Sequence, residues 1–530
     1  MTTDGPDTRE MRHPWDRPLG VWNLAVSNPD HPAILAAPSG RTFTMAGLVG
    51  SAHQLVHAVR ARGVRDGDVV IYALPNDVDI VVWQLAAQES GIQTIALNPA
   101  LSGSEIATIV EHSGAVGIVL HHDHSDRAAE ILAGSDIAVR VSVGGDIPGF
   151  ESVDHLVCGH PTTEPADRRV GLPISYSSGT TGQPKAISRQ RIDLDPTEFA
   201  NGMKLFAHAF RFQPLQGAHM VTAGMHHGGC QSFYQGALHA GQPLVIMGKF
   251  DAEATLAAIE QHRVTTAYMV PTQFVRLLRL PEEVRARYDV SSLEVVVHSA
   301  APCPREVKQQ MMDWWGPVIW ETYGGMEGAA AIAKPHHWLE HPGTVGRAVK
   351  GMAIKILDDD DRELPAGEIG RVFLESDTPT FEYRGDPELT ASVHVGRAFT
   401  LGDIGYLDDD GFLFLCDRAK DMIISGGVNI YPAEVEGVLA THPGVGDVAV
   451  IGVPDPEWGE QVKAIVEPVA GVEPSDALAQ DLIDFCLERL AKFKCPRSVD
   501  FRAELPRTDQ GKLYKRHLRD EYWADADRKV

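Results

Sequence analysis

The sequence predicts a large α/β domain followed by a small α+β domain. The chain has 530 residues, which is more than one hydrophobic core usually supports, so at least two domains are expected. From about Val21 to Leu415, helical patterns alternate with short apolar strands such as residues 68–73 and 293–297. That alternation is typical of parallel α/β layers.

A change of pattern marks the start of the small domain. Residues 405–416 form two apolar strands around Asp410-Gly411, a dipeptide that favours a hairpin turn. Beyond them, Pro432 suits the first turn of a helix, and residues 448–453 have the pattern of a strand. The apolar face of a later helix is expected at Ile483, Cys486, Leu487 and Leu490. These elements predict a compact α+β domain of roughly a hundred residues.

The composition excludes several classes of partner. The formal net charge is −25, from 72 acidic and 47 basic residues, and this balance opposes general binding to nucleic acid or to anionic membranes. The six cysteines show no CxxC spacing, so reduced thiols are expected. Residues 1–19 lack the apolar region of a signal peptide, and no apolar run has membrane-spanning length. We therefore expect a cytoplasmic protein without an integral membrane segment.

The sharpest local signal is the segment YSSGTTGQPK at residues 176–185. Its glycines let the backbone approach a phosphate closely, its hydroxyls can donate hydrogen bonds, and its lysine supplies a point charge. A flexible linker is the alternative, but linkers rarely carry so many hydroxyls closed by Pro-Lys behind an apolar strand, here at residues 170–175. The segment is not a Walker A loop, because Gln183-Pro184 separate the second glycine from the lysine. The expected phosphate-binding residues are Ser177, Ser178, Gly179, Thr180, Thr181, Gly182 and Lys185.

This segment resembles the phosphate-binding motif of the adenylate-forming (ANL) superfamily, which includes bacterial acyl-CoA synthetases such as fatty-acid-CoA ligases. Further segments agree in order. HSAAP at residues 298–302 is similar to the adenine-binding turn of the superfamily. WETYGGMEG at residues 320–328 is similar to the segment whose tyrosine, here Tyr323, stacks on adenine and whose glutamate, here Glu327, holds Mg²⁺. The resemblance implies nucleotide contacts at Ser299, Ala300, Ala301, Pro302, Tyr323 and Gly324.

The later motifs of the superfamily also have counterparts. Asp403 and Arg418 match its ribose contacts, and Lys420 matches its hinge. SGG at residues 425–427 resembles its thioester-forming loop, where glycines would let the pantetheine arm of CoA pass close to the backbone; a simple hairpin turn is the alternative. LPRTDQGK at residues 505–512 resembles the motif whose lysine reaches the carboxylate and the α-phosphate during adenylation. The CoA-binding residues implied are Ser425, Gly426 and Gly427, and the lysine is Lys512.

The resemblance covers nearly the whole chain and implies two domains. Residues 1–419 would form an N-terminal adenylation domain of layered sheets and helices with a small β-barrel subdomain, and residues 420–530 a mobile C-terminal domain. The implied reaction joins a carboxylic acid to the AMP part of ATP, after which the small domain rotates about its hinge and coenzyme A attacks the acyl-AMP. Mg²⁺ on Glu327 is the implied cofactor, and the implied catalytic residues are Lys512, Glu327, His227 and Thr180.

The acyl group is expected near GMHHGGC at residues 224–230, which resembles the family segment bordering the acyl pocket and the thiol tunnel. His227 stands at the gating position, and a packed loop histidine is an equal alternative. This segment and residues 324–331 are rich in glycine and alanine. We therefore expect a bulky or long hydrophobic acid, fatty, polycyclic or terpenoid, rather than acetate. The expected pocket residues are Gly224, His226, His227, Gly228, Gly325 and Met326.

A second histidine cluster invites a metal-site interpretation. His121, His122 and His124 have the density of a metal site, but no carboxylate or cysteine spacing completes it. A solvated loop is therefore expected there.

The chain departs from the superfamily pattern at Met326, where a threonine usually precedes the magnesium glutamate. Loss of one such hydroxyl donor costs about 3 kcal/mol, on the order of a hundredfold in rate. The expected function is an AMP-forming acyl-CoA ligase. Four alternatives stay open: a variant that thioesterifies acyl-adenylate supplied by a separate enzyme, a stand-alone enzyme that loads a carrier protein, a luciferase-like oxygenase that forms the same adenylate, and a catalytically silent nucleotide sensor.

Overall fold

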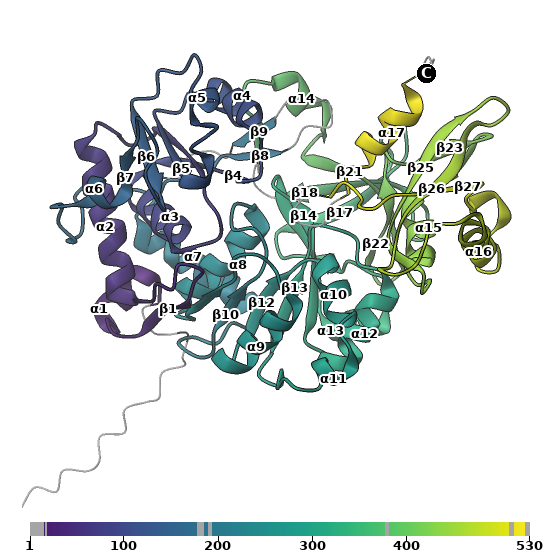
Figure 1. Cartoon of the computed structure of the whole chain (residues 1–530), viewed down its shortest axis with the longest axis horizontal. Coiled ribbons are helices and arrows are strands. Elements are labelled where there is room, and N and C mark those ends of the chain that lie inside the picture. The colour runs from purple at the N-terminus through teal and green to yellow at the C-terminus, as the bar shows by residue number, and fades with distance from the viewer. Residues whose placement is uncertain are drawn as a thin grey trace, which may run out of the picture. The chain divides into compact units, whose positions relative to one another are not determined.

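The computed structural model describes Trp15 and residues 19–177, 185–188, 193–376, 381–507 and 513–524. The chain divides into two compact units, whose elements are labelled in Figure 1. Unit 1 comprises residues 1–175, 190–268 and 288–295, and unit 2 comprises residues 176–189, 269–287 and 296–530. The expected boundary between residues 419 and 420 falls inside unit 2 and stays a prediction.

Unit 1 contains a parallel sheet with the strand order β4-β3-β5-β6-β7. Its strands are β3 (Val69–Ala73), β4 (Gln93–Leu97), β5 (Gly117–His121), β6 (Val139–Val143) and β7 (Glu151–Ser152). Every residue of β3 is buried, as expected for a parallel strand covered on both faces. Side-chain caps start the helices that follow, with Asp77 before α3 (Val78–Ser90) and a Ser102/Glu105 capping box at α4 (Gly103–Ser113).

A second set of strands in unit 1 pairs in the order β12-β10-β11-β1-β2. These strands are β1 (Pro32–Ala36), β2 (Phe43–Thr44), β10 (His219–Val221), β11 (Leu244–Ile246) and β12 (Thr266–Met269). Strand β10 is parallel to both β11 and β12, and the loop at its carboxyl end leads into α8 (Gly228–His239). The remaining helices of this unit are α1 (Val21–Ser27), α2 (Met45–Ala61), η2 (His122–His124), α5 (Ala128–Ile131), α6 (Val153–Val157), α7 (Pro196–Ala209) and α9 (Ala252–His262).

Unit 2 begins with strands that pair in the order β16-β15-β14-β13. They are β13 (Val295–His298), β14 (Ile319–Gly325), β15 (Gly328–Ala333) and β16 (Arg347–Ala348). Strands β13 and β14 are parallel, whereas β14 and β15 form a hairpin in which Gly325 faces Gly328. Met326 and Glu327 are therefore the two residues of its turn. A small sheet, β19-β9-β8, consists of β8 (Ser175–Ser177), β9 (Lys185–Ser188) and β19 (Glu382–Tyr383).

An antiparallel sheet in unit 2 stands where the small barrel subdomain was expected. Its order is β17-β18-β21-β20, with β22 paired to β21. The strands are β17 (Met352–Leu357), β18 (Gly370–Ser376), β20 (His394–Val395), β21 (Ala398–Leu407) and β22 (Leu413–Arg418). Leu407 faces Leu413, and Gly411 has a φ of 78°, so the hairpin turn expected at Asp410-Gly411 is confirmed.

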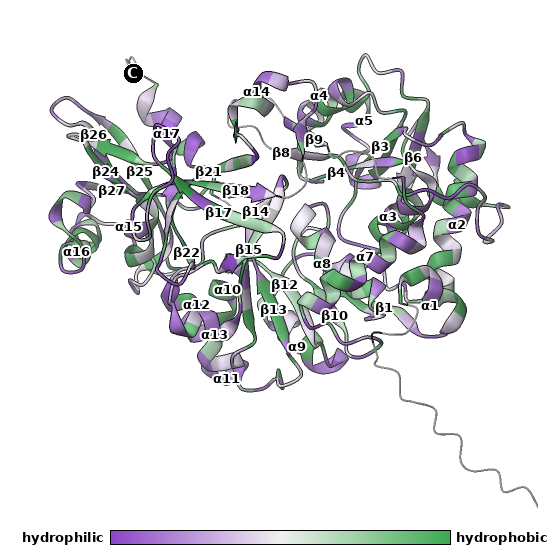
Figure 2. Cartoon of the chain, turned by 180° about the vertical axis from the view of Figure 1, so that it is seen from behind, coloured by the Kyte–Doolittle hydropathy of each residue, from purple (hydrophilic) through white to green (hydrophobic). Residues whose placement is uncertain are grey.

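The C-terminal part of unit 2 has its own sheet, β24-β23-β26-β25, with β27 paired to β26. The strands are β23 (Ile423–Ser425), β24 (Val428–Ile430), β25 (Val445–Asp455), β26 (Gly459–Pro468) and β27 (Ser498–Phe501). Figure 2 shows hydrophobic colouring along β25 and β26, whose buried residues pack with Val435 and Leu439 of α15 (Pro432–Leu439). The predicted helix at Pro432 and the α+β character of this part are confirmed.

The other helices of unit 2 cover its sheets or connect their strands. They are α10 (Pro271–Leu278), α11 (Glu282–Arg285), α12 (Arg305–Trp315), α13 (Pro335–Glu340), α14 (Pro387–Ser392), α16 (Asp476–Leu487), η3 (Lys492–Lys494) and α17 (Lys515–Trp523).

Two local predictions were wrong. The apolar strand expected at residues 170–175 is not formed: of these described residues only Ser175 belongs to a strand, β8. Pro173 lacks an N–H and makes only an isolated bridge to Thr94. On α16 the buried face consists of Leu482 and Cys486, whereas Leu487 is 42% exposed. Cys486 is buried and Leu490 packs against the same core, as expected, so the error is the inclusion of Leu487 in place of Leu482.

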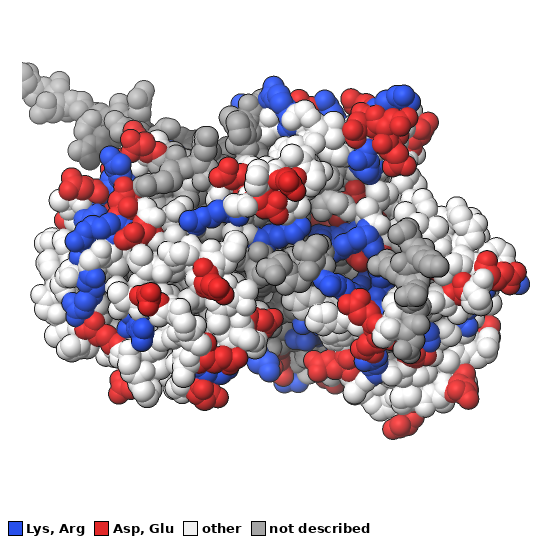
Figure 3. Space-filling view, turned by 90° about the horizontal axis from the view of Figure 1, so that it is seen from above, with Lys and Arg blue, Asp and Glu red and all other residues white. Residues whose placement is uncertain are grey.

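Surface charge and hydropathy agree with the composition. On the face drawn in Figure 3, acidic and basic side chains are interspersed. Among the residues that the structure describes, no helix combines the length and the apolar character needed to cross a membrane.

Candidate active site

A buried carboxylate lies at the centre of the predicted nucleoside site. Asp403 on β21 is 7% exposed, accepts a 2.7 Å hydrogen bond from the hydroxyl of Tyr323 at Oδ2, and has its Oδ1 3.3 Å from Nε of Arg418. The β21–β22 register, which pairs Asp403 with Arg418, and the end of β14 bring these residues together. The structure thus unites three predicted nucleotide-binding residues. A carboxylate held from two sides keeps a fixed orientation, as a contact to ribose hydroxyls requires.

Tyr323 is more buried than an adenine-stacking residue needs to be. Its side chain is 8% exposed and packs in a cluster with Val345 and Phe399. Burial, followed by the charge of Asp403, raises the pKa of the phenol, so the hydroxyl remains a donor. The predicted stacking on adenine stays a prediction, and the hydrogen bond to Asp403 is a role that the sequence did not indicate.

The predicted adenine turn follows β13 and contains an unusual backbone conformation. Ala300 has a φ of 74°, a left-handed conformation that costs a residue with a Cβ about 1 kcal/mol and that tends to cluster at functional sites. Beside it, the hydroxyl of Ser299 donates 2.7 Å to the carbonyl of Thr322 on β14. Ala300 and Pro302 are exposed and Ala301 is half-buried, so the turn offers its backbone to a ligand.

Behind this turn lies a buried charged cluster. Nζ of Lys308, which is 1% exposed, lies 2.6 Å from Oε2 of Glu321, and Nε2 of His298 lies 3.4 Å from the same oxygen. Burial raises the pKa of Glu321, but the charges of Lys308 and His298 outweigh it, so the pKa falls well below its usual range. The cluster joins α12 to β13 and β14, which carry the predicted adenine-binding segments.

The predicted magnesium ligand is held by a residue outside the motifs. Oε1 of Glu327 accepts a 3.0 Å hydrogen bond from the hydroxyl of Tyr383. The face of the same ring lies 5.6 Å from Nζ of Lys185, the lysine of the phosphate-binding segment. A Cβ at position 325 would lie 2.4 Å from Oε2 of Glu327, so a side chain there would displace this carboxylate. Gly324 and Gly325 are exposed, and Met326 is half-buried in the hairpin turn.

These residues fit a magnesium ion bound mainly through a nucleotide. Glu327 offers one half-buried carboxylate whose orientation is fixed by Tyr383. Mg²⁺ prefers hard oxygen ligands and usually keeps several waters, with one or two carboxylates and the phosphates of the substrate. One carboxylate beside a phosphate-binding lysine meets that requirement.

Part of the predicted site lies outside the described residues. This part comprises Ser178, Gly179, Thr180, Thr181, Gly182 and Lys512. Ser177 is described only as the last residue of β8. The roles of these residues therefore stay predictions.

The predicted acyl segment in unit 1 contains two neutral imidazoles, of which His226 is buried and His227 is half-buried. The rings of His226 and His227 lie 3.9 Å apart. Burial lowers the pKa of His226 to about 4, and burial together with His226 lowers that of His227. Nε2 of each ring has no hydrogen-bond partner among the described residues. A neutral ring with an unused polar atom can contact an acyl group without adding charge.

Asn76 holds this segment in place. Its Nδ2 donates 2.8 Å to the carbonyl of Ala223, and its Oδ1 accepts 2.7 Å from the backbone N–H of Met225. Gly224 and Gly228 are half-buried, and Gly228 opens α8; their place in an acyl pocket stays a prediction. The role of Asn76 was not predicted from the sequence.

The predicted thioester loop is the turn of a hairpin. Ser425 faces Val428 in the β23–β24 pair, and the two intervening residues, Gly426 and Gly427, have φ values of 59° and 80°. The N–H of Gly426 donates 2.8 Å to the carbonyl of Trp458. The local geometry is thus a hairpin turn, which was the alternative interpretation of this segment. Both glycines of the turn are exposed, so a narrow ligand can reach them.

Ion pairs anchor the chain on both sides of the Lys512 motif. Before it, Nη2 of Arg507 lies 2.6 Å from Oδ1 of Asp447. After it, the buried Nζ of Lys515 lies 2.8 Å from Oε1 of Glu436 on α15. Arg519 on α17 donates 2.7 Å to the carbonyl of the predicted hinge residue Lys420.

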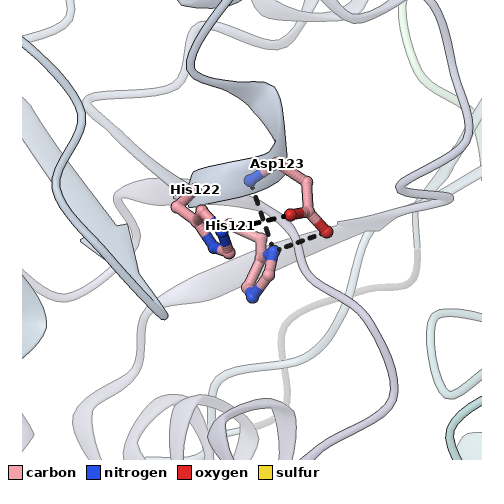
Figure 4. Close-up of side chains that lie close together, drawn as sticks. All are labelled: His121, His122 and Asp123. Carbon is pink, nitrogen blue, oxygen red and sulfur yellow. Dashed lines mark hydrogen bonds and ion pairs between the residues drawn. The ribbon is translucent and has the colours of Figure 1, made fainter.

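The second histidine cluster contains a carboxylate that the sequence analysis did not count. Figure 4 shows His121, His122 and Asp123 side by side. Oδ2 of Asp123 lies 3.0 Å from Nδ1 of His121, and its Oδ1 lies 3.4 Å from Nε2 of His122. His122 and Asp123 are exposed. His124 is 1% exposed and lies in η2, so the expectation of a solvated loop was wrong for this residue.

Comparison with known proteins identifies the family. Residues 21–383 match the AMP-binding enzyme family, and residues 434–512 match the AMP-binding enzyme C-terminal domain. The chain belongs to the AMP-binding enzymes, the adenylate-forming superfamily that its motifs resemble.

Individual relatives match over nearly the full chain. The chain is 31% identical over 516 residues to the fatty acid–[acyl-carrier-protein] ligase ScoC of Streptomyces coeruleorubidus, with 96% of each protein covered. It is 32% identical over 515 residues to feruloyl-CoA synthase of an Amycolatopsis species, with 94% of this chain and 98% of that one covered. The structure of the anthranilate CoA ligase AuaEII with anthranoyl-AMP matches with a TM-score of 0.83 and 25% identity, over 96% and 99% of the two chains. The predicted fold class and the enzyme class, acid–thiol ligase, are confirmed.

Proposed function

We propose that the protein is an acyl-CoA synthetase that converts a bulky or long hydrophobic carboxylic acid to its CoA thioester through an acyl-AMP intermediate. The observation that carries the proposal is the buried carboxylate of Asp403, oriented by Tyr323 and Arg418 at the predicted ribose position. A pre-oriented acceptor beside an aromatic residue suits a nucleoside, and it lies in the same unit as Glu327 and Lys185.

In the first half-reaction, an oxygen of the substrate carboxylate attacks the α-phosphorus of ATP. A P–O bond to the acid forms, the P–O bond to pyrophosphate breaks, and the products are acyl-AMP and pyrophosphate. Lys185 and Lys512 would bind the phosphates and the reacting carboxylate, and Asp403 the ribose. Glu327 would hold Mg²⁺, which neutralises negative charge on the phosphates when bound.

In the second half-reaction, the thiol of CoA attacks the acyl carbon. The new C–S bond replaces the C–O bond to AMP, and the thiol proton is released. The exposed Gly426-Gly427 turn would let the pantetheine arm pass close to the backbone. Lys420 would serve as the hinge about which the C-terminal domain moves between the two halves.

Three features support a hydrophobic acid. The predicted acyl segment offers the neutral pair His226 and His227 rather than a cation. The sequence motifs predicted to line the acyl pocket contain Gly224, Gly228 and Gly325, which occupy little volume. The named substrates of the relatives, a fatty acid, ferulate and anthranilate, are all apolar or aromatic acids. A panel from acetate to long-chain and aromatic acids, assayed by mass spectrometry of the thioester, tests this choice; acetate as the best substrate would overturn it.

A second candidate function rests on Met326. This residue stands in the hairpin turn beside Glu327, where it offers no hydroxyl to the α-phosphate. The candidate is an enzyme with weakened adenylation that thioesterifies acyl-AMP supplied by another enzyme. Pyrophosphate exchange with the cognate acid would then be absent while synthetic acyl-AMP and CoA still gave thioester. A Met326→Thr variant that gains no exchange would show that Met326 is not the cause.

The acceptor and the activity itself have separate tests. The relative ScoC is named as a ligase for acyl carrier protein, so CoA and a carrier protein should be compared as acceptors at equal concentration. A purely nucleotide-sensing protein would bind AMP but form no product with any acid or acyl-adenylate.

A further inference from the structure

Tyr383 is a buried aromatic residue that none of the sequence motifs includes. It is 9% exposed and lies on β19, which pairs with β9, the strand that begins at Lys185. The function proposed above gives roles to Glu327 and Lys185. Tyr383 contacts both of them.

The hydroxyl of Tyr383 orients one oxygen of the Glu327 carboxylate. The hydrogen bond to Oε1 is 3.0 Å long. A phenol hydroxyl is a hydrogen-bond donor and an ionised carboxylate can only accept, so Tyr383 donates to Glu327. An outer hydrogen bond of this kind fixes the direction of a metal-binding carboxylate and leaves its other lone pairs for the cation.

The ring of Tyr383 faces the ammonium group of Lys185. The distance from Nζ to the ring centroid is 5.6 Å, within the range of a cation–π interaction. Tyr383 therefore contacts both the predicted metal ligand and the predicted phosphate-binding lysine. It uses its hydroxyl for the first contact and its ring for the second, so mutation to Phe removes one contact and mutation to Leu removes both.

Tyr383 is itself held firmly. Its N–H donates 3.0 Å to Oγ1 of Thr390, it faces Ile187 in the β19–β9 pair, and its ring meets Phe381 edge-on with centroids 5.4 Å apart. A residue fixed by backbone pairing and packing can hold other side chains without reorganising during the reaction.

We propose that Tyr383 is a positioning residue of the adenylation half-reaction, in which its hydroxyl orients Glu327 toward Mg²⁺ and its ring orients Lys185 toward the phosphates. This role rests on the proposed function, and it assigns Tyr383 to the adenylation half-reaction alone. Because pyrophosphate leaves before CoA attacks, Tyr383 has no role in thioester formation from acyl-AMP.

The test compares Tyr383→Phe, Tyr383→Leu and a control, Tyr406→Phe, in the full-length protein. Tyr406 lies on β21, where its ring stacks on Phe414, and it has no assigned role in the reaction. Three quantities are measured: ATP–pyrophosphate exchange as a function of Mg²⁺, thioester formation from synthetic acyl-AMP and CoA, and binding of Mn²⁺ in the presence of ATP by electron paramagnetic resonance.

Tyr383→Phe is expected to weaken Mn²⁺ binding and to raise the Mg²⁺ concentration needed for half-maximal exchange, each by about tenfold, because a hydrogen bond to a charged group is lost. Tyr383→Leu should also raise the KM for ATP, since the cation–π contact is lost as well. Thioester formation from acyl-AMP should match wild type in all variants. In a Glu327→Gln background, Tyr383→Phe should have no further effect on Mn²⁺ binding.

The outcomes separate this inference from the proposed function. Wild-type metal binding and exchange in Tyr383→Phe would overturn the role of Tyr383 while the proposed function stands. Equal losses in both half-reactions would also overturn it, because they would indicate a general structural role. Weakened Mn²⁺ binding in Tyr383→Phe of a protein that shows no exchange would support the orientation of Glu327 by Tyr383, but it would remove the proposed adenylation and with it the role of Tyr383 in that half-reaction. Absence of both exchange and Mn²⁺–ATP binding in wild type would overturn both.

Discussion

The hydroxyl of Tyr323 donates a 2.7 Å hydrogen bond to Oδ2 of Asp403, across 80 residues of sequence. This bond joins the predicted adenine-stacking residue to the predicted ribose ligand. The ring of Tyr323 packs in the core of unit 2, so its position fixes that of the carboxylate. The two predicted nucleoside contacts are therefore structurally coupled.

A Tyr323→Phe variant tests this coupling. The change keeps the aromatic ring and removes the donor, while the ion pair between Asp403 and Arg418 remains. The KM for ATP is expected to rise by about tenfold, with a smaller change in the rate of thioester formation from acyl-AMP. Unchanged ATP kinetics would show that the Tyr323 hydroxyl is not needed to orient the carboxylate.

The buried cluster behind the adenine turn is expected to control stability. Lys308→Met leaves the charge of Glu321 uncompensated and should destabilise the fold by about 3–5 kcal/mol. The double variant Lys308→Met/Glu321→Gln removes both charges and should recover most of this loss, as measured by chemical denaturation. A double variant no more stable than Lys308→Met would contradict the ion-pair explanation and indicate a packing defect.

The two glycines of the thioester loop should respond differently to alanine. A Cβ on Gly426 would lie 2.4 Å from Cε3 of Trp458, whereas a Cβ on Gly427 would meet nothing within 4 Å. Gly426→Ala should therefore distort the hairpin. Gly427→Ala should cost only about 1 kcal/mol for its left-handed φ.

If the pantetheine arm passes this turn, Gly427→Ala should still lower thioester formation by more than tenfold while pyrophosphate exchange stays at the wild-type rate. Stopped-flow measurement of the two half-reactions separates these effects. A wild-type rate of CoA transfer in Gly427→Ala would place the thiol path elsewhere.

Stability should fall in mild acid because three histidines in unit 1 are buried in the neutral form. Burial lowers the pKa of His219 to about 3 and that of His226 and His239 to about 4. Their unfolded value is about 6.5, so below that pH the unfolded chain binds more protons than the folded one. Each histidine contributes stability that is fully present above pH 6.5 or so and decreases as the pH falls toward the folded pKa, by up to about 2 kcal/mol at pH 5.

Urea denaturation at pH 7 and pH 5 measures this effect. His219→Gln should reduce the difference in stability between the two pH values, whereas His336→Gln, at an exposed position, should leave it unchanged. Equal pH dependence in wild type and His219→Gln would exclude this histidine as a source of acid sensitivity.

Much of the site could be predicted because its residues occur in contiguous motifs. Glu327, Gly426 and Gly427 stand in turns whose chemistry is local, and Asp403 ends a recognisable segment. Tyr383 and Asn76 escaped prediction because their roles depend on contacts 56 and 149 residues away in sequence. The buried Lys308 gave no sign of its environment, since a lysine on a helix is usually solvated. The strand expected at residues 170–175 failed for a local reason, the missing N–H of Pro173.

The most direct test of the proposed function follows one hydrophobic acid through both half-reactions. Purified protein is incubated with ATP, Mg²⁺, CoA and a long-chain or aromatic acid, and AMP, pyrophosphate and acyl-CoA are quantified together. The proposal predicts equal amounts of all three products, with acyl-AMP accumulating when CoA is omitted. Thioester formed from supplied acyl-AMP but not from ATP and acid, or AMP bound without any product, would contradict it.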